Sequence, residues 1–113
     1  MNEQVNVYTE KYPDAISCMF RSLRELVYDA SSDDVLETMW AGMPSYYVGN
    51  AFVRLIPFKD HINIEAKAIM NHMEELTEYK ITPKGMLQIY ANQTVPTVVL
   101  SRIFAETLAI NEA

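Results

Sequence analysis

The sequence predicts an α+β fold of two layers, in which an antiparallel β-sheet is packed on one face by N- and C-terminal helices. Amphipathic helical patterns lie near both ends of the chain, and short β-rich segments joined by tight turns lie between them. Sequential strands with short connections pair antiparallel, and helices at the chain ends can then share one face of the sheet. The expected order is helix, three or four strands, helix, strand and helix, in one domain spanning residues 1–113.

A first helix is predicted over residues 13–30. Pro13 suits a first helical position, and Asp14 favours the positive end of the helix dipole. The serine and aspartate run at residues 31–34 ends the helix, and the residues before Pro13 give only a poor signal for an extra helical turn. The apolar residues at the spacing of one helix face are Ile16, Met19, Phe20, Leu23, Leu26, Val27 and Ala30.

An antiparallel meander is predicted to follow. Gly49-Asn50 is a favourable two-residue hairpin turn, and Lys59-Asp60 makes a second tight turn. Pro44 cannot lie inside a central ladder, so it marks a strand start or an edge. The predicted strands are residues 36–41, 45–48, 51–58 and 61–65.

The last third of the chain predicts a helix, a strand and a helix. Ile69, Met73 and Leu76 lie on one side of a helix over residues 66–78. A turn at residues 82–85 leads into a short strand over residues 86–90. The closing helix, over residues 95–110, is entered through Pro96 and has Val99, Leu100, Ile103, Phe104 and Leu108 as its buried stripe.

Composition and charge narrow the classes of function. The chain has 113 residues, of which 50% are hydrophobic, and a formal net charge of −6. An acidic chain repels phosphate backbones, so nucleic-acid binding is not expected. No apolar run approaches the roughly 18 residues of a membrane span. The single cysteine, Cys18, allows no intramolecular disulfide, and the N-terminus has no signal-peptide pattern, so we expect a cytoplasmic protein.

Four segments of the chain carry turn and packing motifs in a particular order: Trp40-Ala41-Gly42-Met43-Pro44-Ser45-Tyr46, Gly49-Asn50, Lys59-Asp60-His61-Ile62, and Tyr79-Lys80 leading to Lys84-Gly85-Met86-Leu87-Gln88-Ile89. In this order they resemble the YdhG-like family of small bacterial domains. The resemblance implies a frataxin-like fold, a sheet backed by helices. It also implies, from a branch described as iron chaperones, delivery of iron(II) to an iron-accepting partner protein. The matching residues are mostly turn and packing residues rather than ligands.

A set of carboxylates is the candidate metal site. Residues 1–37 hold eight acidic and three basic residues, and carboxylate oxygens are ligands that iron(II) accepts. The predicted ridge at the helix-to-strand corner, in a place similar to that of a frataxin, comprises Glu25, Asp29, Asp33, Asp34 and Glu37. The alternative is a solvated surface, in which Arg21 pairs with Glu25 and the aspartates cap or solvate a turn.

The open sheet face is the second candidate, for a non-enzymatic module that binds a small molecule or a protein. The strand at residues 51–58 places apolar side chains on both faces, which leaves an apolar patch where helices are absent. We predict a ligand or partner surface around Trp40, Tyr46, Arg54 and His61. A central strand covered on both sides and a homodimer seam remain as alternatives.

An enzyme is the least expected class. The chain contains no GxGxxG, P-loop, GxSxG or CxxC motif, and His61 and His72 stand in no metal-ligand spacing with Cys18. No catalytic residue is therefore predicted.

Overall fold

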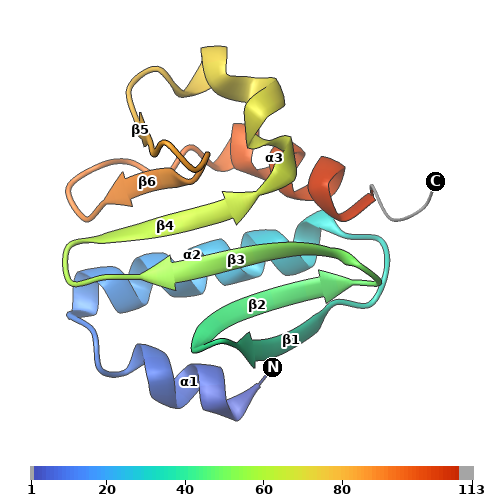
Figure 1. Cartoon of the computed structure of the whole chain (residues 1–113). Coiled ribbons are helices and arrows are strands. Elements are labelled where there is room, and N and C mark those ends of the chain that lie inside the picture. The colour runs from blue at the N-terminus through green and yellow to red at the C-terminus, as the bar shows by residue number, and fades with distance from the viewer. Residues whose placement is uncertain (1, 110–113) are drawn as a thin grey trace.

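The computed structural model describes residues 2–109, which form three α-helices, one 3₁₀ helix and six strands (Figure 1). The helices are α1 (Glu3–Thr9), α2 (Asp14–Ala30), the 3₁₀ helix η1 (Lys67–Leu76) and α3 (Thr97–Ala109). The strands are β1 (Leu36–Trp40), β2 (Met43–Val48), β3 (Ala51–Pro57), β4 (His61–Ala66), β5 (Lys80–Ile81) and β6 (Leu87–Tyr90).

The strands form one open antiparallel sheet in the order β1-β2-β3-β4-β6-β5. Two-residue turns set the register of the first hairpins, because Trp40 pairs with Met43 and Val48 pairs with Ala51. Pro44 lies at the start of β2 and pairs only with β1, where its missing N–H costs no bond to β3. The predicted meander and its Gly49-Asn50 turn are confirmed.

Helices α2 and α3 cover the same face of the sheet and lie behind it in the view of Figure 1. Side chains alternate along each strand, so Val53 and Leu55 of β3 point into the helix-facing core and are fully buried. Phe52, Arg54 and Ile56 lie on the opposite face, in front of the sheet in this view. The predicted class, a two-layer α+β fold with end helices on one face, is confirmed.

Several elements differ from their predicted form. Residues 3–9 form a full helix, with the Asn2 side chain accepting a hydrogen bond from the Gln4 backbone. The segment after β4 is a 3₁₀ helix with a non-helical backbone at His72, and Met73, expected on the buried side, is 42% exposed. Strand β5 was not predicted, since two residues carry no periodicity. Residue 110 of the predicted closing helix lies outside the described residues.

Hydrogen bonds from His72 fasten η1 to α3. Its Nδ1 lies 2.8 Å from Glu75 Oε1, and its Nε2 lies 2.9 Å from Glu106 Oε2 on α3. Glu75 also accepts a 2.6 Å hydrogen bond from Arg102 of α3. The contacts with Glu75 and Glu106 raise the pKa of His72. The cluster therefore ties η1 to the helix layer behind the sheet.

A buried ion pair joins α1, α2 and β1. Arg24 donates two 2.6 Å hydrogen bonds to the Glu37 carboxylate, from Nε and Nη2, and a third of 2.6 Å to Asn6. The Asn2 backbone N–H donates to Glu37 as well. Burial acts to raise the pKa of Glu37, but the hydrogen bonds from Arg24 and Asn2 outweigh it and hold the pKa below its usual value. The pair is therefore part of the core and not of the surface.

None of the helices within residues 2–109 combines the length and the apolar character needed to cross a membrane.

We expect Glu37→Gln to lower the free energy of unfolding by about 3 kcal/mol, because it leaves the Arg24 charge buried without its counter-ion. The measurement is urea denaturation. Glu25→Gln, the same change at an exposed position of α2, should stay within about 0.5 kcal/mol of the wild type. Equal effects of the two substitutions would contradict this assignment.

Candidate functional site

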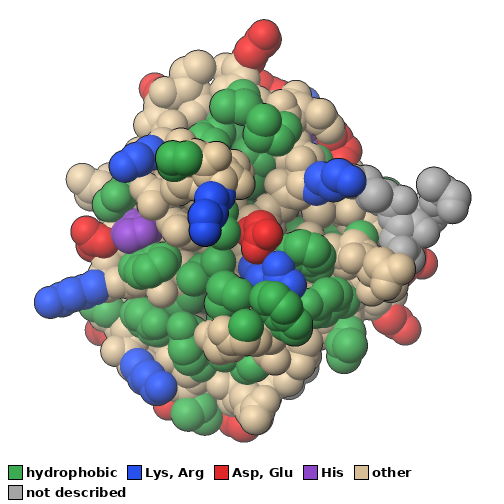
Figure 2. All heavy atoms as spheres, viewed as in Figure 1, with side chains coloured by type: hydrophobic (Ala, Val, Ile, Leu, Met, Phe, Trp, Pro, Cys, Tyr) green, Lys and Arg blue, Asp and Glu red, His purple; other side chains and the backbone are tan. Residues whose placement is uncertain are grey.

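The sheet face away from α2 and α3 carries a continuous set of aromatic and polar side chains. Hydrophobic side chains gather over its middle and lower strands in Figure 2, with an acidic and a basic side chain side by side near the centre. Trp40 is 51% exposed and Phe58 41% exposed. From β1 to β6 this open face comprises Leu36, Thr38, Trp40, Met43, Ser45, Tyr47, Phe52, Arg54, Ile56, His61, Asn63, Glu65, Gln88 and Tyr90.

Arg54 is the centre of the open face. Its guanidinium carbon lies 4.2 Å from the centroid of the Trp40 ring and 4.0 Å from that of the Phe52 ring, within the range of cation–π attraction. The aromatic rings cover the side chain, so Arg54 is only 7% exposed although α2 and α3 pack on the other face. A charged residue thus serves as a structural support for the aromatic surface.

Three hydrogen bonds fix the Arg54 guanidinium. Nε donates to Ser45 Oγ, Nη1 to Glu65 Oε1 and Nη2 to the Tyr47 hydroxyl, each at 3.1 Å. Ser45 and Glu65 are the direct cross-strand partners of Arg54 on β2 and β4. Sheet register therefore brings this polar cluster together and neutralises Arg54 with Glu65.

A second aromatic stack continues the open face at the turn between β3 and β4. The His61 ring stacks on Phe58 at 4.6 Å and on Tyr90 at 4.8 Å between ring centroids. Asp60 Oδ1 lies 2.7 Å from His61 Nδ1, which orients the ring. This stack gives the open face a second flat aromatic area, separate from the one around Arg54.

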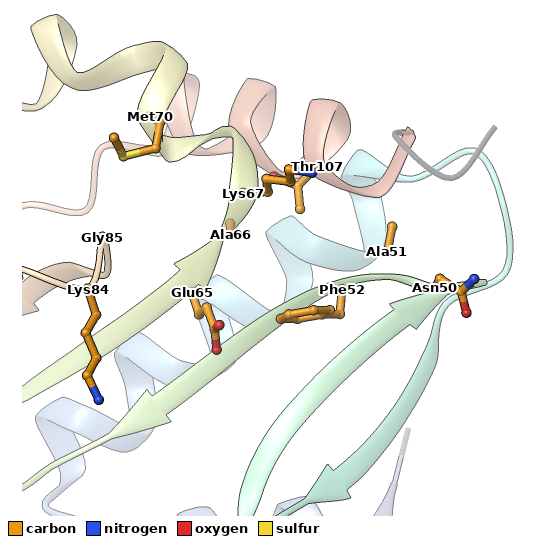
Figure 3. Close-up of a pocket in the computed structure, with 10 residues that line it drawn as sticks. All are labelled: Asn50, Ala51, Phe52, Glu65, Ala66, Lys67, Met70, Lys84, Gly85 and Thr107. Atoms are coloured by element: carbon orange, nitrogen blue, oxygen red, sulfur yellow. The ribbon is translucent and has the colours of Figure 1, made fainter. Parts of the chain in front are cut away.

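A hollow of about 570 Å³ opens on the same face, where η1 and the turn before β6 rise above the sheet (Figure 3). Phe52 and Glu65 of the open face line it, together with Lys67 and Met70 of η1. Lys84 lines it from the turn, and Figure 3 shows Lys84 and Lys67 on opposite sides of Glu65. A volume of this size lies within the range of small-molecule sites.

The turn at residues 82–85 positions Lys84 beside the hollow. The Gly85 N–H donates to the Thr82 carbonyl at 2.8 Å, and the Met86 N–H donates to the Thr82 hydroxyl at 3.1 Å. Gly85 adopts a φ of +88°, which a side chain disfavours. The glycine thus permits a tight turn with Lys84 immediately before it.

Three of the four residues predicted for the sheet surface share the open face, namely Trp40, Arg54 and His61. Tyr46 does not, and this part of the prediction is wrong. Because Trp40 pairs with Met43 across the turn, Met43, Ser45 and Tyr47 point to the open face and Tyr46 points to the helices.

The buried Tyr46 belongs to the helix-facing core. It is fully buried and packs edge-to-face against Tyr28 at 6.0 Å. Its hydroxyl has no hydrogen-bond partner of good geometry. Burial and the nearby Glu37 charge raise the pKa of Tyr46. Tyr46 therefore contributes to the fold and does not contact a ligand on the open face.

Four residues of the predicted acidic ridge are exposed in the structure and the fifth is buried. Glu25, Asp29, Asp33 and Asp34 are exposed, at the end of α2 and in the loop to β1. Glu37 is 6% exposed and its carboxylate forms an ion pair with Arg24. The prediction that Glu37 is a surface metal ligand is therefore wrong. Among residues 2–109, no three His, Cys, Asp or Glu side chains gather in a group that could hold a metal ion.

Sequence reasoning missed Tyr47, Glu65, Lys67, Met70 and Lys84. Tyr47 and Glu65 follow from strand register once Arg54 is placed, because both lie on strands beside or near it on the same face. Lys67, Met70 and Lys84 come from the 3₁₀ helix and from a turn. Their approach to β3 depends on tertiary packing, which no local pattern in the sequence records.

Comparisons of the chain with protein-family models, with curated proteins and with solved structures gave no match. The resemblance to the YdhG-like family therefore stays a prediction, and the function is argued from the open face.

We expect Arg54→Lys to lower the free energy of unfolding by about 1–3 kcal/mol, because an ammonium cannot replace the planar fork that bonds Ser45, Tyr47 and Glu65 together. Denaturation followed by the fluorescence of Trp40, the single tryptophan, measures it. Arg102→Lys is the control, since Arg102 pairs with Glu75 at an exposed site and should change stability by less than about 1 kcal/mol. A loss no larger at Arg54 than at Arg102 would refute the central role of Arg54.

Proposed function

We propose that this chain is a non-enzymatic binding module that holds a small ligand in the hollow on its open sheet face. The observation that carries the proposal is the position of the hollow: its 570 Å³ volume adjoins an exposed aromatic surface. Exposed apolar surface of this kind is typical of ligand and interaction sites.

The walls of the hollow support binding. Phe52, Ala51, Ala66 and Met70 supply its apolar surface, and charged groups stand at separate points on its lining. Ligand sites typically combine apolar walls with a few placed polar groups, which orient the ligand. Methionine is flexible and polarizable, so Met70 can adapt to ligands of different shape.

The chemistry of the lining favours binding over catalysis. Neither histidine nor cysteine occurs among the described residues that line the hollow. The Thr107 hydroxyl, which lines the hollow, already accepts a hydrogen bond from the Ala68 backbone N–H. The Glu65 carboxylate, which also lines the hollow, is paired with Arg54. This set offers a ligand contacts but provides no nucleophile placed beside a free base.

Met70→Glu should weaken binding of the neutral fluorescent probe N-phenyl-1-naphthylamine about tenfold, because it replaces an apolar wall with a charge. Met70 is 62% exposed, so the protein should stay folded. Fluorescence titration gives the affinity. Met73→Glu is the matched control, because Met73 lies on the same helix but does not line the hollow. If both variants bound the probe as the wild type does, the hollow would not be its site.

Iron(II) binding by the acidic residues is the second candidate, and the exposure of Glu25, Asp29, Asp33 and Asp34 supports it. We expect anaerobic calorimetry to detect weak iron(II) binding. Neutralising these four residues together should abolish it. Neutralising four other exposed acids, Glu3, Glu10, Glu74 and Glu78, is the control. No heat with iron(II), or equal loss in both variants, would remove this candidate.

A further inference from the structure

We propose that the ligand of the hollow is an amphipathic organic monoanion, whose charged head pairs with one lysine of the lining, Lys67 or Lys84, and whose apolar body lies against Phe52 and Met70. The proposal rests on the proposed function and names the class of ligand for the same site. The heads that fit this chemistry are a carboxylate, a sulfonate or a phosphate diester.

The lining of the hollow is positively charged, although the chain as a whole is acidic. The chain has a formal net charge of −6, yet the lining of the hollow holds two lysines and a single carboxylate, that of Glu65. Arg54 donates to this carboxylate at 3.1 Å and offsets its charge. Lys67 and Lys84 therefore leave a local positive charge in a concave part of an otherwise acidic protein, and concave sites concentrate the field on a ligand.

The two lysines of the lining are not paired with carboxylates of the described residues. Neither Lys67 nor Lys84 forms an ion pair with a carboxylate of residues 2–109, whereas Arg24, Arg54 and Arg102 each do. Both lysines are exposed, and they line the hollow from different segments, η1 and the turn before β6. Either ammonium group can bind an anionic head, as ammonium groups bind carboxylates and phosphates.

The position of Glu65 limits the class to ligands of low charge. Figure 3 shows its carboxylate between Lys84 and Phe52, on the sheet beneath the hollow. A polyanion that extended from the lysines toward the sheet would meet this carboxylate and be repelled. A single head beside one of the lysines, with an apolar body along Phe52 and Met70, avoids that repulsion and removes apolar surface from water.

Two probes of nearly identical shape test the inference. 1-Anilinonaphthalene-8-sulfonate and N-phenyl-1-naphthylamine share their rings, but only the first carries a sulfonate. We expect the wild type to bind the sulfonate about tenfold more tightly than the neutral probe, with the preference falling as salt is added. The double variant Lys67→Gln, Lys84→Gln should lose the preference. The control, Lys59→Gln with Lys80→Gln, makes the same change of net charge at exposed lysines outside the hollow and should retain it.

Failure of the monoanion inference can be distinguished from failure of the proposed function. Equal affinity for the two probes, or an equal loss of preference in the two double variants, overturns the monoanion inference. The proposed function survives that result if Met70→Glu still weakens the neutral probe. If Met70→Glu alters the binding of neither probe, the hollow is not the site and both proposals are overturned.

Discussion

The open face of the sheet, opposite α2 and α3, depends on one buried cation, Arg54. Helices α2 and α3 cover a single face of six strands, so the other face has to order its own side chains. Arg54 does this because sheet register places Ser45 and Glu65 directly beside it, and because Trp40 and Phe52 close over its guanidinium. A guanidinium suits the task, since it combines a planar surface for aromatic rings with donors for three acceptors. The aromatic surface is thereby held in one arrangement before any ligand arrives.

Some charged side chains of the protein stabilise the fold, and others remain for binding. The Arg24–Glu37 pair and the Arg54–Glu65 pair are both internal to the fold, one under the helices and one on the open face. Lys67 and Lys84 stand apart from both pairs and line a hollow whose apolar wall includes Phe52, the same ring that covers Arg54. The structural cluster and the proposed ligand site therefore share two side chains, Phe52 and Glu65, which makes the shape of the hollow depend on the order of the sheet.

Regular patterns in the sequence predicted most of the fold, and contacts between distant segments account for the errors. Helical spacing predicted α2 within a residue of its limits, and the Gly49-Asn50 turn predicted the β2–β3 register. Tyr46 was placed on the wrong face because an error of one residue in a strand reverses every side chain. Glu37 was taken for a surface ligand because its partner, Arg24, lies 13 residues away on a helix. The hollow could not be predicted, since packing alone brings residues of η1 and of the turn before β6 to the same hollow as Phe52 of β3.

Mapping of backbone amide shifts by nuclear magnetic resonance tests the location of the site most directly, with 1-anilinonaphthalene-8-sulfonate as the ligand. The account predicts that the largest shifts will cluster at Phe52, Glu65, Lys67, Met70 and Gly85, around the hollow. Shifts concentrated at the acidic end of α2, or spread evenly over both faces of the sheet, would contradict it.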